Sequence, residues 1–188
     1  MTNASSLLTM KERSHLEALL HWNVDIFVWS HSDMLRIDVF VVAHKLNILQ
    51  NMRSERQKVR SFHPNCQKVI QMVIDKLLLA NFIWEVAYLD CLSNIVVVPK
   101  KRGTWRMCMD YTNLNDTCPK DSFLLRRIDQ IVDSTSGNEM LYFLNVFFSY
   151  HQIPMFRLDQ EKTTFITLHG LYYYNIMPFG LKNVGATY

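Results

Sequence analysis

The chain has 188 residues, with 20 basic and 17 acidic side chains, a formal net charge of +3 and a hydrophobic fraction of 49%. This length and composition allow one or two domains with a packed core. Because basic and acidic residues are nearly balanced, the net charge does not by itself indicate a nucleic-acid partner. The sequence has no signal-peptide core and no run as long as a membrane span, so we expect an intracellular protein, in the cytoplasm or nucleus, without a membrane partner.

The first half of the chain predicts two helices separated by a long connector. A Thr-x-x-Glu capping box at Thr9 and leucines at helical spacing predict a short helix near 10–22. Residues 23–62 show no sustained period, and we interpret them as an extended connector. Pro64 begins a second helix that ends near Asn81. The apolar face of this helix consists of Cys66, Val69, Ile70, Val73, Leu77 and Leu78.

The second half, which holds all five glycines, alternates between strand and helix patterns without the regular rhythm of a parallel sheet. The predicted elements are a hairpin of 95–98 and 105–111 around the turn 100–104, a helix at 126–133, a strand at 140–144, a hairpin of 163–168 and 171–176, and a helix from Asn183. An α+β fold follows from this order.

Cysteine and histidine spacing argues against a metal or redox site. The four cysteines form no Cys-x-x-Cys pair, and the seven histidines form no His-x-x-x-His pair. We expect the cysteines to be buried thiols in a reducing compartment. The sequence predicts no oligomeric state.

Two short windows concentrate the basic residues. The first contains Arg53, Arg56, Lys58 and Arg60, and the second contains Lys100, Lys101, Arg102 and Arg106. Either window is explained by a solvated face. The second window also lies at the tip of a predicted hairpin, where its cations are placed to close over a triphosphate.

Four longer segments resemble the reverse transcriptases of gypsy-type LTR retrotransposons. They are NIVVVPKKRGTWRMCMDYTNLN at 94–115, CPKDSFLLRRID at 118–129, FLNVFFSYHQIPM at 143–155 and MPFGLKNVGATY at 177–188. Upstream, 25–34, 44–48 and 56–64 resemble the connector between protease and polymerase in plant elements of this type. The resemblance spans about residues 11–188.

This resemblance implies a partial right-hand polymerase fold from a Gag-Pol polyprotein. Residues 1–62 are then the N-terminal helix and connector, and 63–188 are a truncated reverse transcriptase domain, with fingers and the first part of the palm. The family activity is RNA-directed DNA polymerase, a nucleotidyltransferase that uses deoxynucleoside triphosphates, a primer–template and Mg²⁺.

The resemblance also assigns candidate site residues. The nucleotide-binding candidates are Lys101, Arg106, Tyr150, Phe179 and Gly180, with the two basic residues on the triphosphate. The template-binding candidates are Asp110, Asn115 and Lys182. On spacing alone, without the resemblance, we favour ordinary core packing for Tyr150.

Asn145 occupies the position at which the family has a metal-binding aspartate. A carboxamide has one neutral oxygen and cannot bridge two hard divalent ions, so we predict that this chain binds no metal cofactor and is inactive. The family's Ser-Gly pair is Phe148-Ser149 here, and its Tyr-x-Asp-Asp motif lies beyond the last residue given. Two family prolines are replaced by Leu124 and Arg126, which predicts an earlier start of the following helix.

Two further interpretations are compatible with the sequence. The chain could be a non-catalytic module that binds primer–template weakly through phosphates. It could also be a poorly folded product with no selected role, in which the 140–144 strand exposes an unpaired edge.

Overall fold

The structure is a computed structural model that describes residues 8–26, 33–49, 56–101, 103, 105–123, 127–138 and 149–187. The chain forms two compact units, Met1–Met34 and Leu35–Tyr188. The predicted domain boundary after residue 62 differs from the boundary between these compact units and stays a prediction.

The first unit contains α1 (Met10–Trp22), as predicted. The capping box is present, because the Thr9 hydroxyl accepts a hydrogen bond from the Glu12 amide and the Glu12 carboxylate accepts one from the Thr9 amide at 2.8 Å. These bonds with Thr9 lower the pKa of the Glu12 carboxyl. A one-turn 3₁₀ helix, Val24–Ile26, follows, and neither helix buries a side chain.

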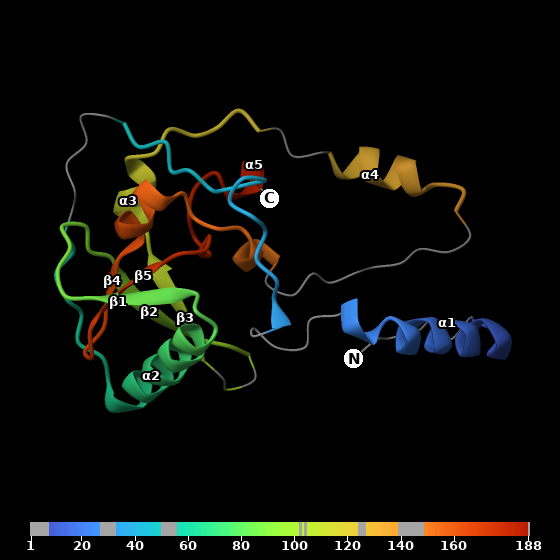
Figure 1. The fold of residues 1–188 in the computed structure, drawn as a ribbon, viewed down its shortest axis with the longest axis horizontal. Helices are drawn as coiled ribbons and strands as arrows, with labels where there is room; N and C mark the ends of the chain where they lie inside the picture. Colours follow the sequence, from blue (N-terminus) through green and yellow to red (C-terminus); the bar gives the residue numbers. More distant parts are fainter. Residues whose placement is uncertain are drawn as a thin grey trace. The chain divides into compact units, whose positions relative to one another are not determined.

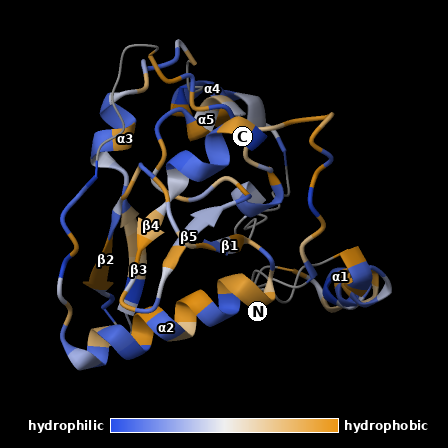
Figure 2. Cartoon of the chain, turned by 60° about the vertical axis from the view of Figure 1, so that its left-hand side comes forward, coloured by the Kyte–Doolittle hydropathy of each residue, from blue (hydrophilic) through white to orange (hydrophobic). Residues whose placement is uncertain are grey.

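In the second unit, α2 (Pro64–Leu79) begins and ends where the sequence predicts (Figure 1). Pro64 is in the first turn, and Asn81 has a positive φ of 55° just after the helix. The buried residues of α2 are Ile70, Ile74 and Leu77. Ile74, only 1% exposed, is absent from the predicted apolar face, although Figure 2 shows the amphipathic colouring of the helix.

The predicted central hairpin is confirmed. Strands β2 (Asn94–Pro99) and β3 (Trp105–Asp110) pair antiparallel, with Val98 opposite Arg106. The turn is closed by a hydrogen bond from the Gly103 amide to the Lys100 carbonyl at 3.1 Å, and Gly103 has a φ of 73°. This positive φ is the reason for a glycine at that position.

A three-stranded sheet has the order β1–β5–β4, with all pairs antiparallel. The second predicted hairpin is confirmed in shorter form, as β4 (Phe165–Ile166) and β5 (Leu171–Tyr174). The edge strand β1 (Ile83–Val86) was not predicted. It is only four residues long and follows α2 closely, so its sequence carries little strand signal. The strand forms because it pairs with the distant β5.

Short helices complete the second unit and confirm the α+β class. They are α3 (Thr112–Asp116), α4 (Ile128–Thr135), the 3₁₀ helices η3 (Ser149–Gln152) and η4 (Arg157–Thr163), and α5 (Val184–Thr187). The helix predicted at 126–133 begins two residues later, after an extended Arg127, and an earlier start than in the family stays a prediction. The predicted strand 140–144 and the replaced prolines at 124 and 126 lie outside the described residues.

The core draws on segments from the whole second unit. Its buried cluster consists of Leu46, Tyr111, Cys118, Ile153, Met155, Met177 and Leu181. Leu46 comes from the predicted connector, which therefore packs as part of the domain. All four cysteines are free thiols, but only Cys118 is buried, so the prediction of buried thiols is wrong for the other three.

Candidate nucleotide-binding face

The tip of the β2–β3 hairpin exposes the two predicted phosphate contacts. Lys101 lies in the turn and Arg106 near the start of β3, and both side chains are exposed. Because side chains alternate along a strand, Arg106 shares one side of β3 with Cys108. Arg106 lowers and Cys108 raises the pKa of the Tyr150 phenol, so both residues lie within electrostatic range of its hydroxyl.

Tyr150 joins the hairpin to the core. Its half-buried ring packs against the buried cluster and lies edge-on to His151, with centroids 4.5 Å apart. Burial raises the pKa of the Tyr150 phenol, and the Arg106 guanidinium opposes that rise, so the hydroxyl is neutral at physiological pH. The ring thus packs in the core while its hydroxyl lies in the field of a surface cation.

Phe179 and Gly180 form the opposite side of this face. The Phe179 ring is 63% exposed, and its centroid lies 6.1 Å from that of Tyr150 at an angle of 49°. Gly180 has a φ of 99°. A Cβ at Gly180 would meet the Met109 carbonyl oxygen at an ordinary 3.7 Å, so backbone conformation rather than lack of space requires glycine here.

Asn115 and Lys182, two of the predicted template contacts, are hydrogen-bonded to each other. The Asn115 side-chain amide donates to the Gly180 carbonyl at 2.8 Å and accepts from the Lys182 backbone amide at 2.7 Å. The Lys182 ammonium donates to the carbonyls of Asn115 and Cys118, at 3.2 and 2.8 Å. We name these four bonds the α3 clamp, because they hold the Phe179–Lys182 turn against α3. A template role for either residue stays a prediction.

Asp110 faces a different set of partners. Its carboxylate accepts from the Thr112 hydroxyl at 2.7 Å and from the Arg60 guanidinium at 2.9 Å. The Thr112 hydroxyl is the largest cause of the lowered pKa of Asp110, and Arg60 adds to it. Arg60, from the first basic window, is therefore an ion-pair partner rather than a purely solvated side chain.

Sequence reasoning missed the residues that hold Arg60 in place. The Gln57 side-chain oxygen accepts from the Asn94 backbone amide at 2.9 Å, and the Asn94 oxygen accepts from the Arg60 backbone amide at 3.2 Å. An open polar hollow surrounds these residues, lined by Gln57, Lys58, Val59, Arg60, Asn94, Asp110, Thr112 and Asn113. No local pattern pairs glutamine and asparagine so far apart in sequence, and only the fold brings them together.

The described residues do not fit a divalent metal. Asn145 lies outside them, and among them no three His, Cys, Asp or Glu side chains gather closely enough to hold an ion. The Asp110 carboxylate, at the end of β3, is already paired with Arg60. Whether this chain binds a metal stays a prediction.

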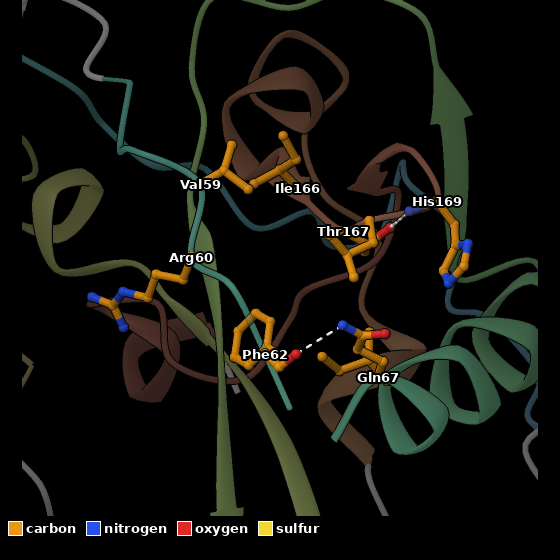
Figure 3. A pocket seen from close by; sticks show the side chains of 9 residues that line it. Val59, Arg60, Phe62, Gln67, Ile166, Thr167 and His169 are labelled. Atoms are coloured by element: carbon orange, nitrogen blue, oxygen red, sulfur yellow. Dashed lines mark hydrogen bonds between the residues drawn. The ribbon is translucent and has the colours of Figure 1, made fainter. Parts of the chain in front are cut away.

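A small, mostly apolar pocket lies apart from the predicted site residues. It is lined by Val59, Arg60, Phe62, Gln67, Ile70, Ile166, Thr167, Leu168 and His169 (Figure 3). Gln67 donates to the Phe62 carbonyl at 2.7 Å, and the Thr167 hydroxyl accepts from the His169 amide at 3.0 Å. These bonds fix the connector and the β4–β5 turn around the pocket.

The second half of the chain is similar to proteins of one family. Residues 98–188 match the family model described as reverse transcriptase (RNA-dependent DNA polymerase). A Pol polyprotein from transposon 412 of Drosophila melanogaster is 27% identical over 181 residues, which cover 90% of this chain and 14% of the polyprotein. An RNA-directed DNA polymerase homolog of Oenothera berteroana is 32% identical over 83 residues, 44% of this chain and 58% of that protein.

Solved structures give the fold. The prototype foamy virus protease-reverse transcriptase matches 95% of this chain and 24% of its own chain with a TM-score of 0.76 at 22% identity. The foamy viral enzyme in complex with dsDNA matches 96% of this chain and 35% of its own, with a TM-score of 0.71 at 19% identity. The predicted partial right-hand polymerase fold is thus confirmed. None of the described helices is long and apolar enough to cross a membrane. Residues 98–188 are thus similar to the reverse transcriptase domain of retrotransposon polyproteins.

Proposed function

We propose that the β2–β3 hairpin, Tyr150 and Phe179 form a face that binds primer–template nucleic acid and nucleotide without catalysing nucleotidyl transfer. The observation that carries this proposal is the convergence of an exposed cation and two rings. Arg106 acts on the Tyr150 hydroxyl, and the Tyr150 ring lies 6.1 Å from the exposed Phe179 ring. The chain spans only 14% of the transposon 412 polyprotein, so the activity and partners of a whole protein of this kind are part of the proposal.

Each side chain on the face has a distinct chemical role in this proposal. The Arg106 guanidinium offers two parallel N–H donors to a phosphate, while the Lys101 ammonium acts as a point charge on the same anion. The exposed Phe179 ring offers a surface on which a base can stack. The α3 clamp keeps Phe179 and Gly180 beside β3, so Asn115 and Lys182 support the face rather than carry the ligand.

The absence of catalysis follows from Asn145. Replacing an anionic oxygen pair by a carboxamide removes a full negative charge from the position at which the family holds Mg²⁺. A loss of about 5 kcal/mol of transition-state stabilisation lowers a rate roughly 5,000-fold. We therefore expect no incorporation of labelled nucleotide above a blank when primer–template is supplied with Mg²⁺ or Mn²⁺. Incorporation above the blank would refute this part of the proposal.

The binding part is tested by fluorescence anisotropy with a labelled primer–template between about 50 and 200 mM salt. The wild-type affinity should fall steeply with salt, and the double variant Lys101→Ala/Arg106→Ala should reduce the log–log slope by about 0.9 for each phosphate that is no longer neutralised. The matched control removes Lys68 and Lys76, two exposed lysines of α2 outside the face. A control that lowers the slope as much as the double variant would place binding elsewhere.

We also propose that the parent is a gypsy-type element of plant type acting inside the cell. The segments 25–34, 44–48 and 56–64 support this origin. Sequencing the genomic DNA that follows the Tyr188 codon tests whether such an element continues there as a polymerase. An in-frame Tyr-x-Asp-Asp segment would indicate a longer polymerase, whereas stop codons or unrelated sequence would indicate a relic.

A further inference from the structure

A buried histidine, His44, connects the N-terminal connector to the rest of the domain. It is 1% exposed and forms a parallel bridge with Met155. Its backbone amide donates to the Pro154 carbonyl at 2.9 Å, and its carbonyl accepts from the Phe156 amide at 2.8 Å. None of the proposed nucleotide or template roles involves this residue.

The two ring nitrogens of His44 have unequal surroundings. Nδ1 shares a hydrogen bond of 2.8 Å with the Thr187 hydroxyl of α5. Nε2 is buried and has no hydrogen-bond partner among the described residues. A neutral imidazole fits this environment, because one nitrogen is bonded and the other carries only a lone pair. An imidazolium would place a second N–H where no described acceptor lies, and an unsatisfied buried donor is unfavourable.

The charged groups near the His44 ring do not provide an acceptor for the second N–H of an imidazolium. Asp159 of η4 is the carboxylate that acts on His44, but Oδ2 accepts from the Leu46 amide at 3.0 Å and Oδ1 accepts from the Lys162 ammonium at 3.2 Å. Cys118, which Asp159 and Lys162 also influence, keeps a neutral thiol because burial raises its pKa. The Asp159 carboxylate is thus already compensated by an amide and a cation.

We propose that His44 is a proton-controlled latch: when neutral it holds the connector segment 35–49 to α5 and to residues 154–156, and when protonated it releases them. The segment has four further attachments, namely Arg36 to the Asn81 carbonyl, Ile37 to Gln152, Leu46 to Asp159 and Leu49 to Thr117. His44 lies in the middle of this series, where release would expose Leu46 and Met155 of the core. Such a release does not require nucleic acid.

The direction of the pH effect follows from linkage. Burial lowers the pKa of His44 below its ordinary value of 6.5, and Asp159 only partly opposes this shift. In the released state the pKa returns to about 6.5, so the released state takes up the proton first as pH falls. The His44 latch is fully present above about pH 6.5 and weakens from there down to the lower pKa of the buried ring. Below that second pKa the weakening stops.

Hydrogen exchange of the full chain, followed by mass spectrometry at about pH 7.5 and 5.5 and corrected for intrinsic rates, tests the His44 latch. Peptides containing the His44, Leu46 and Phe156 amides should exchange up to about tenfold faster at the lower pH. The variant His44→Gln keeps a polar partner for Thr187 but does not titrate, and its exchange should not change with pH. His169→Gln, at an exposed position in the same unit, should retain the wild-type response.

Two outcomes would overturn the proposal. One is equal corrected exchange of the wild type at both pH values, and the other is an unchanged pH response in His44→Gln. If His44→Gln does not melt cooperatively, NMR titration of the wild-type imidazoles replaces it. An imidazole with a pKa below about 6.5 that is absent from spectra of unfolded chain supports the latch. Seven imidazoles that all titrate at or above about 6.5 contradict it.

Discussion

The hairpin tip and the α3 clamp both contain residues predicted to contact a ligand, the nucleotide at the tip and the template in the clamp, but the two sets of residues make different contacts. At the tip, Lys101 and Arg106 are both exposed, and Arg106 also acts on the Tyr150 hydroxyl. In the α3 clamp, Asn115 and Lys182 direct their polar groups to backbone atoms of the domain. A motif therefore identifies residues that matter without distinguishing ligand contacts from contacts that position the ligand-binding surface.

The largest expected effect on stability comes from breaking the α3 clamp. Asn115→Ala removes two hydrogen bonds and leaves the Gly180 carbonyl and the Lys182 amide without their partner, which should lower the free energy of unfolding by about 2 kcal/mol. Urea denaturation measures this change. Lys101→Ala is the matched control from the tip and should stay within about 0.5 kcal/mol of wild type. Equal reductions in the free energy of unfolding of the two variants would contradict the proposed difference between the α3 clamp and the hairpin tip.

Arg106→Lys separates charge from geometry at the tip. Lysine keeps the positive charge but lacks the planar pair of donors, so primer–template affinity should fall about tenfold, roughly 1.4 kcal/mol, while the salt slope stays unchanged. Anisotropy titrations at several salt concentrations give both quantities. Full retention of affinity would mean that only the charge of Arg106 contributes.

Gly180→Ala tests the turn that joins the two regions. At a φ of 99° a side chain strains the backbone, so stability should fall by about 1 kcal/mol even though the added methyl group has room. Thermal unfolding reports the reduction. Gly103→Ala, at a φ of 73° in the hairpin turn, is the matched comparison and should show a similar strain without loosening the α3 clamp.

The smallest effect is expected at Asp110. Its lowered pKa means that its interactions with Thr112 and Arg60 stabilise the fold above about pH 4 and disappear as pH falls through the lower folded pKa. Because Arg60 is half exposed, the pair contributes less than about 1 kcal/mol. Asp110→Asn should flatten the stability–pH curve in this window. A curve that keeps its full slope would assign the titration to other carboxyls.

The sequence predicted those parts of the fold that have local signals. Pro64 and the alternating pattern of 105–111 specify α2 and β3, and both lie where expected. Strand β1 and helix α3 were missed because each has only a few residues and depends on distant partners, β5 and the Phe179–Lys182 turn. Short elements of this kind are specified by tertiary pairing rather than by propensity.

The sequence predicted which residues belong to the candidate site, but not which of them form hydrogen bonds that hold the site together. The motifs identified Arg106, Tyr150 and Phe179, which the fold brings together. They did not reveal that Asn115 and Lys182 bind each other, because a motif lists identities along the chain and not hydrogen bonds across it. Gln57 and Asn94 lie within segments that resemble the family, but nothing in the sequence assigned either residue a role, since amide side chains occur throughout any sequence.

Photocrosslinking tests the binding face most directly. A primer–template with 5-iododeoxyuridine at the primer terminus and the first templating position would be irradiated with the full chain, digested and analysed by mass spectrometry. The proposal predicts crosslinked peptides that contain Tyr150 or Phe179, and their disappearance in about 200 mM salt. Crosslinks confined to α1 or α2, with none at Tyr150 or Phe179, would contradict it.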